Sequence, residues 1–433
     1  MRRVSERAIL VGVRQKRAAR RGDGLPVEPP VEPEESLDEL EQLSRSAGAT
    51  VLQKTLQSRE RLDAATLVGR GKLEEIHEQA AAQNANLLIF DSDLSATQQR
   101  NIEKLTDCRV VDRTQLILDI FARHARTREG QLQVELAQLS YLLPRLTGRG
   151  VEMSRLGGGI GTRGPGETQL EMDRRRIRGR IRWLINNLEK VRSERMRRRS
   201  RRTSVPIATL ALVGYTNAGK STLFNRLTQA QVLTSPQMFA TLDPTARSVE
   251  LPSRRRVLLS DTVGFLRNLP HTLIQAFRAT LEEVSEAQLL LMVSDCSSPA
   301  RAQQDQEVEK VLQEIGAREK PILRIGNKVD LLSSEERQRL EARGDQVLIS
   351  AKTGEGLDRL LSAMDRQLPL DPIEHVRLRF THREGNKLSS VYQSGRVLRR
   401  DDADGFVLVD AEIPHSLVDR LKDHLTDADG DRP

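Results

Sequence analysis

The chain is poor in aromatic residues, cysteine and long apolar runs. Phe, Trp and Tyr make up 3% of its 433 residues, and its two cysteines, Cys108 and Cys296, fit no metal-ligand spacing. Disulfides are rare in reducing compartments, so this cysteine usage favours a cytoplasmic protein. No run approaches the ~18 apolar residues of a membrane span, and the apolar stretch Ala8–Val13 is too short for a signal peptide. We therefore expect no membrane span and no signal peptide.

Charge, by contrast, is abundant and unevenly placed. Charged residues make up 30% of the chain, and the net charge is +8. The segment Arg174–Arg202 holds fourteen Arg or Lys residues against two Glu. A solvated helix normally mixes signs, so this segment favours a polyanionic partner such as RNA. A solvated or disordered basic linker is the alternative.

The pattern of apolar residues predicts four regions. Residues 1–113 alternate short apolar runs with helical patterns, which is typical of a small α/β domain with a largely parallel sheet. Residues 114–202 are expected to be helical, with Pro144 disturbing the end of one helix. Residues 203–370 return to an α/β pattern, and residues 371–433 suit a small α+β module. Within residues 203–370, helices are predicted around Leu273–Val284, Ala302–Ile315 and Leu357–Leu368.

A glycine-rich segment interrupts the helical region. Six of the ten residues 157–166 are glycine, which favours a loop because glycine disfavours regular helix and strand. An Arg-rich helix is predicted over Glu167–Met196. Two helices joined by such a loop would form a projection able to reach into a large partner, although a flexible hinge is the alternative.

The strongest motif follows the apolar strand predicted at Ile207–Val213. It matches G-x-x-x-x-G-K-[ST] and opens a predicted helix at Lys220, which is the context of a phosphate-binding loop (P-loop). Backbone N–H groups would wrap the phosphates, Lys220 would reach the terminal ones, and the Ser221 hydroxyl would ligate Mg²⁺. The predicted nucleotide contacts of this motif are Gly214, Tyr215, Thr216, Asn217, Ala218, Gly219, Lys220, Ser221 and Thr222.

Two later motifs favour guanine over adenine. A carboxylate at Asp330 can accept hydrogen bonds from guanine N1 and N2, and adenine does not offer this pair of donors. A second short motif follows the next predicted strand and would complete the base pocket. Each motif is weak alone, but their order and strand-end positions predict the base contacts Asn327, Lys328, Val329, Asp330, Ser350, Ala351 and Lys352.

A third motif, D-x-x-G, ends the strand predicted at Arg256–Ser260. Asp261 would hold Mg²⁺ through water, and the Gly264 amide would contact the γ-phosphate. An ordinary strand-end turn is the alternative. Thr241 is the candidate for a second hydroxyl on Mg²⁺, with Thr245 as its rival. The residues assigned to this side of the nucleotide are Phe239, Ala240, Thr241, Leu242, Asp243, Asp261, Thr262, Val263 and Gly264.

With these motifs in order, the chain resembles the translation-factor-related GTPases and, more narrowly, the HflX family of ribosome-associated GTPases. The resemblance rests on the motifs above, on residues 67–72 (LVGRGK) and on residues 157–176. It covers about Ala65 to Leu370, and we draw nothing from the first ~30 or last ~60 residues.

The resemblance implies a monomeric GTPase that binds GTP or GDP with Mg²⁺. It also implies binding to rRNA of the large ribosomal subunit and dissociation or rescue of ribosomes under stress. A nucleotide-gated RNA-binding switch with little turnover and an ATP-dependent RNA remodeller are the alternatives. The expected ribosome contacts are Gly157, Gly158, Gly159, Gly161, Arg163, Gly164, Gly166, Arg174, Arg175 and Arg176.

Hydrolysis itself is expected to be slow without a partner. Many GTPases place a water-orienting Gln after D-x-x-G, but here that residue is Phe265. No catalytic residue can be named from the sequence. In potassium-activated GTPases that the chain resembles locally, an Asn at the position of Asn217 helps to bind K⁺. Asn217 is therefore a candidate K⁺ ligand, the alternative being that it only suits a turn.

Overall fold

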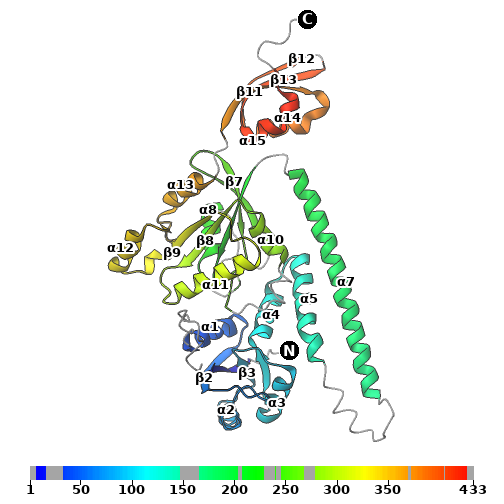
Figure 1. Cartoon of the computed structure of the whole chain (residues 1–433), viewed down its shortest axis with the longest axis vertical. Coiled ribbons are helices and arrows are strands. Elements are labelled where there is room, and N and C mark those ends of the chain that lie inside the picture. Colours follow the sequence, from blue (N-terminus) through cyan, green and yellow to red (C-terminus); the bar gives the residue numbers. More distant parts are fainter. Residues whose placement is uncertain are drawn as a thin grey trace, which may run out of the picture.

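The computed structural model describes residues 6–15, 33–146, 165–202, 207–228, 239, 245–267, 278–368, 372–403 and 405–426. Three separate sheets follow one another along the long axis of the molecule, and the long helix α7 (Pro165–Arg202) lies alongside the N-terminal and central parts (Figure 1). In the described part of the chain, no helix combines the length and apolar character needed to cross a membrane.

The N-terminal sheet is entirely parallel, with strand order β2-β1-β3-β4. Alternate residues of a strand face opposite sides, so Leu10 packs with Leu40 on one face while Ile9 packs with Ile76 on the other. Both faces are thus covered, as parallel sheets require, and the expected α/β domain is confirmed. Its elements are β1 (Arg7–Gln15), α1 (Pro33–Ser46), β2 (Thr50–Arg59), α2 (Arg70–Gln83), β3 (Leu87–Phe90), α3 (Ala96–Thr106) and β4 (Arg109–Asp112).

Helices α4 (Arg113–His124), α5 (Arg128–Arg145) and α7 form the helical region. Pro144 lies one residue before the end of α5, where the sequence predicts a disturbed helix end. Helices α5 and α7 pack together, and Leu184 of α7 is fully buried. Most of the glycine-rich segment lies outside the described residues, namely Gly157, Gly158, Gly159, Gly161, Arg163 and Gly164. Gly166 lies in the first turn of α7.

The central sheet has the order β10-β9-β8-β5-β7-β6 and is parallel except for β6. Two of its elements are not expected from the sequence. Strand β6 buries little besides Val249, and α12 buries no residue, so neither carries a clear apolar period. The elements are β5 (Ala208–Gly214), α8 (Lys220–Thr228), β6 (Thr245–Glu250), β7 (Arg256–Asp261), α10 (Arg278–Glu286), β8 (Leu289–Asp295), α11 (Arg301–Glu314), β9 (Ile322–Asn327), α12 (Ser334–Arg343), β10 (Val347–Leu348) and α13 (Leu357–Gln367).

The C-terminal module is an antiparallel sheet of order β11-β13-β12 with helices packed against it. Along β13, buried residues alternate with half-buried ones, so one face of the sheet builds a core and the other meets solvent. The α+β character is as expected, but the helix α14 was not predicted from the sequence. The elements are β11 (Ile373–Thr381), α14 (Gly385–Ser394), β12 (Arg396–Ala403), β13 (Phe406–Pro414) and α15 (His415–Arg420).

Candidate nucleotide-binding site

The turn from β5 into α8 has a backbone that only certain residues adopt. Gly214 and Gly219 have φ angles of 150° and 94°. A Cβ at Gly214 would lie 2.2 Å from the Val293 carbonyl oxygen, and one at Gly219 would lie 2.2 Å from Asn327 Nδ2. Asn217 takes a left-handed conformation with φ of 60°, which Asn tolerates better than most residues. The motif's glycines are therefore required by the shape of the loop.

Lys220 is buried beneath this loop. Its Nζ donates to the carbonyl oxygens of Gly214 at 3.0 Å and Tyr215 at 2.7 Å. Burial lowers the pKa of Lys220 to about 8, although the negative charge of Asp261 opposes this shift. The Lys220 ammonium therefore lies against the P-loop. There it could replace its hydrogen bonds to the two carbonyl oxygens with hydrogen bonds to phosphate oxygens.

The D-x-x-G segment after β7 lies directly against the P-loop. Thr216 N donates to Phe265 O at 2.8 Å, and Phe265 N donates to Gly214 O at 3.1 Å. A Cβ at Gly264 would lie 2.9 Å from Thr216 Cα and 3.0 Å from Lys220 Nζ. The two motifs are therefore joined by backbone hydrogen bonds, and Gly264 has no room for a side chain between Thr216 and Lys220.

The chemistry of this corner suits a nucleotide with Mg²⁺. Asp261 is fully buried, and Thr216 Oγ1 is a buried atom that has no hydrogen-bond partner in the structure. Mg²⁺ prefers hard oxygen donors and commonly binds through a hydroxyl, a carboxylate and phosphates together. Ser221 and Asp261 would supply the hydroxyl and the carboxylate, and the orphaned Thr216 hydroxyl suits a phosphate oxygen.

The residues predicted to contact the guanine base come from segments that are far apart in the sequence. Asn327 is 2% exposed; its Nδ2 donates to Ala218 O at 2.8 Å, and its Oδ1 accepts from Ala351 N at 2.9 Å. Ser350 Oγ donates to Asp330 Oδ1 at 2.6 Å. The segments that contain Asn327, Asp330 and Ser350 are thus brought to the P-loop, as their sequence order predicts.

One contact in the base pocket was not expected from the sequence. Arg226, on α8, donates from Nη2 to the Lys352 carbonyl oxygen at 2.8 Å and from Nε to the Ala351 carbonyl oxygen at 3.4 Å. Since α8 begins at Lys220, this arginine connects the loop containing Ala351 and Lys352, which is predicted to meet the base, to the helix that follows the P-loop.

Some predicted residues remain without a described position. Ala240, Thr241, Leu242 and Asp243 lie outside the described residues, so the preference for Thr241 over Thr245 stays a prediction. Thr245 begins β6 and pairs in register with Asp261. Phe239 is 3% exposed, and its ring meets that of Phe121 edge-on at 4.4 Å.

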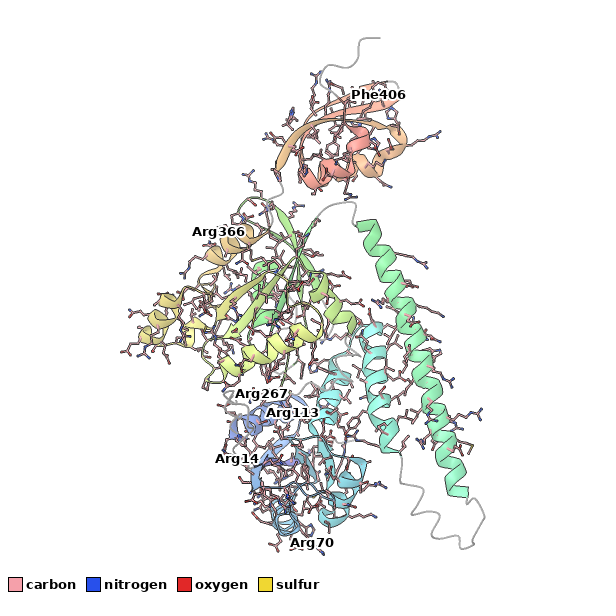
Figure 2. All side chains as sticks on the ribbon, viewed as in Figure 1. Arg14, Arg70, Arg113, Arg267, Arg366 and Phe406 are labelled. Atoms are coloured by element: carbon pink, nitrogen blue, oxygen red, sulfur yellow. The ribbon has the colours of Figure 1, made fainter. Side chains whose placement is uncertain are left out.

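The P-loop also contacts the N-terminal domain. The Tyr215 hydroxyl donates to Glu39 Oε2 at 2.5 Å and accepts from Arg267 N at 3.0 Å. Glu39 is also hydrogen-bonded by Arg113, which donates to Asp91 Oδ1 at 2.7 Å. Arg113 and Arg267 lie where the two domains meet (Figure 2).

Two groups of this cluster have shifted pKa values, Arg113 and Tyr215. Burial works against the charge of Arg113, but Glu39 and Asp91 together raise its pKa above the ordinary value. Burial also raises the pKa of Tyr215, with Glu39 adding to the effect, so its hydroxyl stays protonated and donates. Sequence reasoning missed this cluster, since Glu39 and Tyr215 are 176 residues apart and belong to no shared motif.

Comparisons with known proteins agree with this geometry. Family models match residues 34–122 (GTP-binding GTPase, N-terminal), 124–202 (GTP-binding GTPase, middle region) and 209–328 (50S ribosome-binding GTPase). The GTPase HflX of Caldanaerobacter subterraneus is 46% identical over 91% of both chains. That of Escherichia coli is 45% identical over 88% of this chain and 90% of the relative.

Among solved structures, that of a GTP-binding protein from Sulfolobus solfataricus in complex with GDP matches the chain. It is 24% identical, has a TM-score of 0.42, and covers 83% of this chain and 97% of the other. The matched domains and the close relatives show that the chain is a GTP-hydrolysing enzyme. It belongs to the HflX family of GTPases.

Proposed function

We propose that this GTPase binds the large ribosomal subunit and couples its GTP cycle to the dissociation or rescue of ribosomes under stress. The observation that carries the proposal is the match of residues 209–328 to a model described as a 50S ribosome-binding GTPase. A ribosomal partner would place the protein in the cytoplasm, where it would act as a monomer.

Helix α7 supports contact with rRNA. Arg175, Arg176, Arg178 and Arg182 are exposed on it, and neutralisation of phosphates by such residues supplies both affinity and salt dependence. We propose that Arg174–Arg176 and the glycine-rich segment before them contact the subunit together.

The arrangement at Phe265 supports slow hydrolysis without a partner. Phe265 is 2% exposed, and both its amide and its carbonyl are hydrogen-bonded to the P-loop. A buried apolar side chain cannot orient an attacking water. Stimulation would come from the ribosomal subunit, and Asn217, which is exposed in the P-loop, is proposed to hold a K⁺ that supplies positive charge.

The test is GTP hydrolysis by the purified protein, alone and with purified large subunits, in K⁺ buffer and in Na⁺ buffer. We expect strong stimulation by the subunit, faster turnover in K⁺, and loss of the K⁺ effect in Asn217→Ala. ATP serves as a parallel substrate, and gradient sedimentation of intact ribosomes reports dissociation. Tight GTP binding without stimulation or subunit release would contradict the ribosomal proposal while leaving the GTPase activity intact.

A further inference from the structure

The only tryptophan of the chain lies on the outer side of α7. Trp183 is 44% exposed, whereas its neighbour Leu184 is fully buried against the rest of the helical region. Large aromatic side chains stabilise a fold mainly by burial. An exposed indole in a chain with 3% aromatic residues therefore calls for another partner.

The indole is held in a fixed setting. The Arg180 guanidinium carbon lies 4.2 Å from the centroid of the Trp183 ring. Arg180 is fixed in turn by α5, because its Nε and Nη2 donate to the two carboxylate oxygens of Glu135 at 2.7 and 2.8 Å. Such a bidentate pair defines the orientation of the guanidinium plane. The ring and its cation thus lie together in a defined relative position.

Space is open one helical turn before this ring. Side chains on a helix lean toward its N-terminus, so Trp183 leans over the turn that contains Gly179. A Cβ added at Gly179 would have no atom within 4 Å. Glycine inside a helix is less stabilising than alanine. This position thus gives up helix stability and leaves room for a flat group beside the indole.

The surroundings favour a nucleic acid over a lipid or an apolar protein surface. Arginine occupies positions 174, 175, 176, 178, 180 and 182, and no acidic residue occurs from 174 to 188. Among the described side chains of α7, the other exposed large apolar ones are Met172 and Ile185. Met172 lies eleven residues from Trp183, and residues two apart on a helix, such as Trp183 and Ile185, do not face each other. Unpaired bases stack on aromatic rings and guanidinium planes while arginines neutralise their phosphates.

We propose that Trp183, backed by Arg180, is a stacking platform for an unpaired RNA base. The inference rests on the proposed ribosomal function and names the kind of rRNA element that α7 takes: a single-stranded loop or bulge. Stacking of one base contributes about 1–3 kcal/mol, so loss of the indole is expected to weaken single-strand binding roughly tenfold.

The test uses the full-length protein and the fluorescence of its single tryptophan. The probes are a single-stranded RNA of about 12 nucleotides, a duplex of the same length, and inorganic polyphosphate as a probe of charge alone. We expect the single strand to quench the emission, and polyphosphate to bind with little quenching. Trp183→Leu is expected to bind the single strand about tenfold more weakly, as measured by anisotropy of labelled RNA. Its affinity for polyphosphate is expected to equal that of the wild type.

Two further variants complete the design. Trp183→Phe keeps a ring and is expected to recover most of the affinity, and Met172→Ala removes an exposed apolar side chain elsewhere on α7 as a matched control. Unchanged GDP binding shows that each variant is folded. Equal affinity of wild type and Trp183→Leu for both RNA and large subunits would overturn the platform and leave the ribosomal function standing. Failure of the wild type to bind either would overturn both.

Discussion

Lys220 combines a cationic side chain with a fully buried position. Its hydrogen bonds to Gly214 and Tyr215 satisfy only part of the ammonium group, and burial lowers its pKa to about 8. Each pKa unit corresponds to about 1.4 kcal/mol. The fold therefore carries a cost at the residue that is predicted to bind the phosphates.

Replacing this lysine should stabilise the nucleotide-free protein. In Lys220→Met, we expect a gain on the order of 1–3 kcal/mol in unfolding free energy at pH 7 together with loss of nucleotide binding. Because the folded pKa lies below the unfolded value, the unfolded chain binds more protons between about pH 8 and 10.5, and wild-type stability rises with pH there. Calorimetric unfolding from pH 7 to 9.5 should show the two proteins converging; parallel curves would contradict the assignment.

Arg226 acts at the opposite side of the same site. Its hydrogen bonds to the carbonyls of Ala351 and Lys352 hold the loop that is predicted to meet the base. Arg226→Ala should weaken GDP binding about fivefold, since a hydrogen bond from an exposed charged donor contributes on the order of 1 kcal/mol. Competition by pyrophosphate, which has no base, should be unchanged.

The control for that variant is Arg343→Ala, an exposed arginine at the end of α12 in the same domain. It should change neither measurement. Equal losses of GDP and pyrophosphate binding in Arg226→Ala would show a general defect of the site and refute the proposed role in holding the base loop.

The shape of the P-loop could be predicted at residue level because its motif is local, whereas its nucleotide contacts stay predictions. Gly214 to Ser221 lie next to one another in the chain, and their backbone geometry demands glycine at fixed positions. The contact between Tyr215 and Glu39 could not be predicted, because it depends on how two domains meet. Arg226 was missed because its partners, although in the same domain, lie more than a hundred residues away in the sequence.

Among the elements, those with a clear apolar period were the ones predicted. Strand β3 buries every residue, and Val308, Val311 and Leu312 place one face of α11 in the core, so both show in the sequence. Helix α12 buries nothing and is stabilised at its start by a capping box between Ser333 and Glu336. A helix that contributes nothing to a core leaves no periodic signal.

Helix α1 is hydrogen-bonded to the P-loop through the Glu39 carboxylate, which is 10% exposed. Removal of Glu39 would leave Arg113 with only Asp91 and would leave the Tyr215 hydroxyl without its acceptor. Glu39→Ala should therefore cost about 2–4 kcal/mol, as is typical when one member of a buried charged pair is removed. Calorimetry gives the loss in stability, and amide exchange should locate it in α1 and the P-loop.

Asp38→Ala is the matched control for that change on the same helix. The Asp38 side chain is 66% exposed and pairs with Lys54 at the surface, where ion pairs contribute little. Its stability should differ from wild type by less than about 1 kcal/mol. Similar losses of unfolding free energy in both variants would show that the buried cluster stabilises the protein no more than a surface ion pair does.

For the whole molecule, the distribution of the cores shows which parts depend on each other. One apolar cluster runs from the N-terminal domain and the helical region into the central domain, joining Leu40, Phe121 and Val134 to Val213 and Phe265. The C-terminal module has its own cluster, from Leu378 to Leu421. The first three regions thus share a core, and the last one packs upon itself.

This division predicts the effect of ending the chain after Leu368. The shared core and the nucleotide site lose no member of their clusters, so GDP affinity should stay within about twofold and the main unfolding transition should keep its midpoint. Small domains with their own core unfold as separate units, so calorimetry of the full chain should show a further transition that the shortened chain lacks. A large drop in GDP affinity would instead mean that the C-terminal module supports the central domain directly, and the two would then have to be treated as one folding unit.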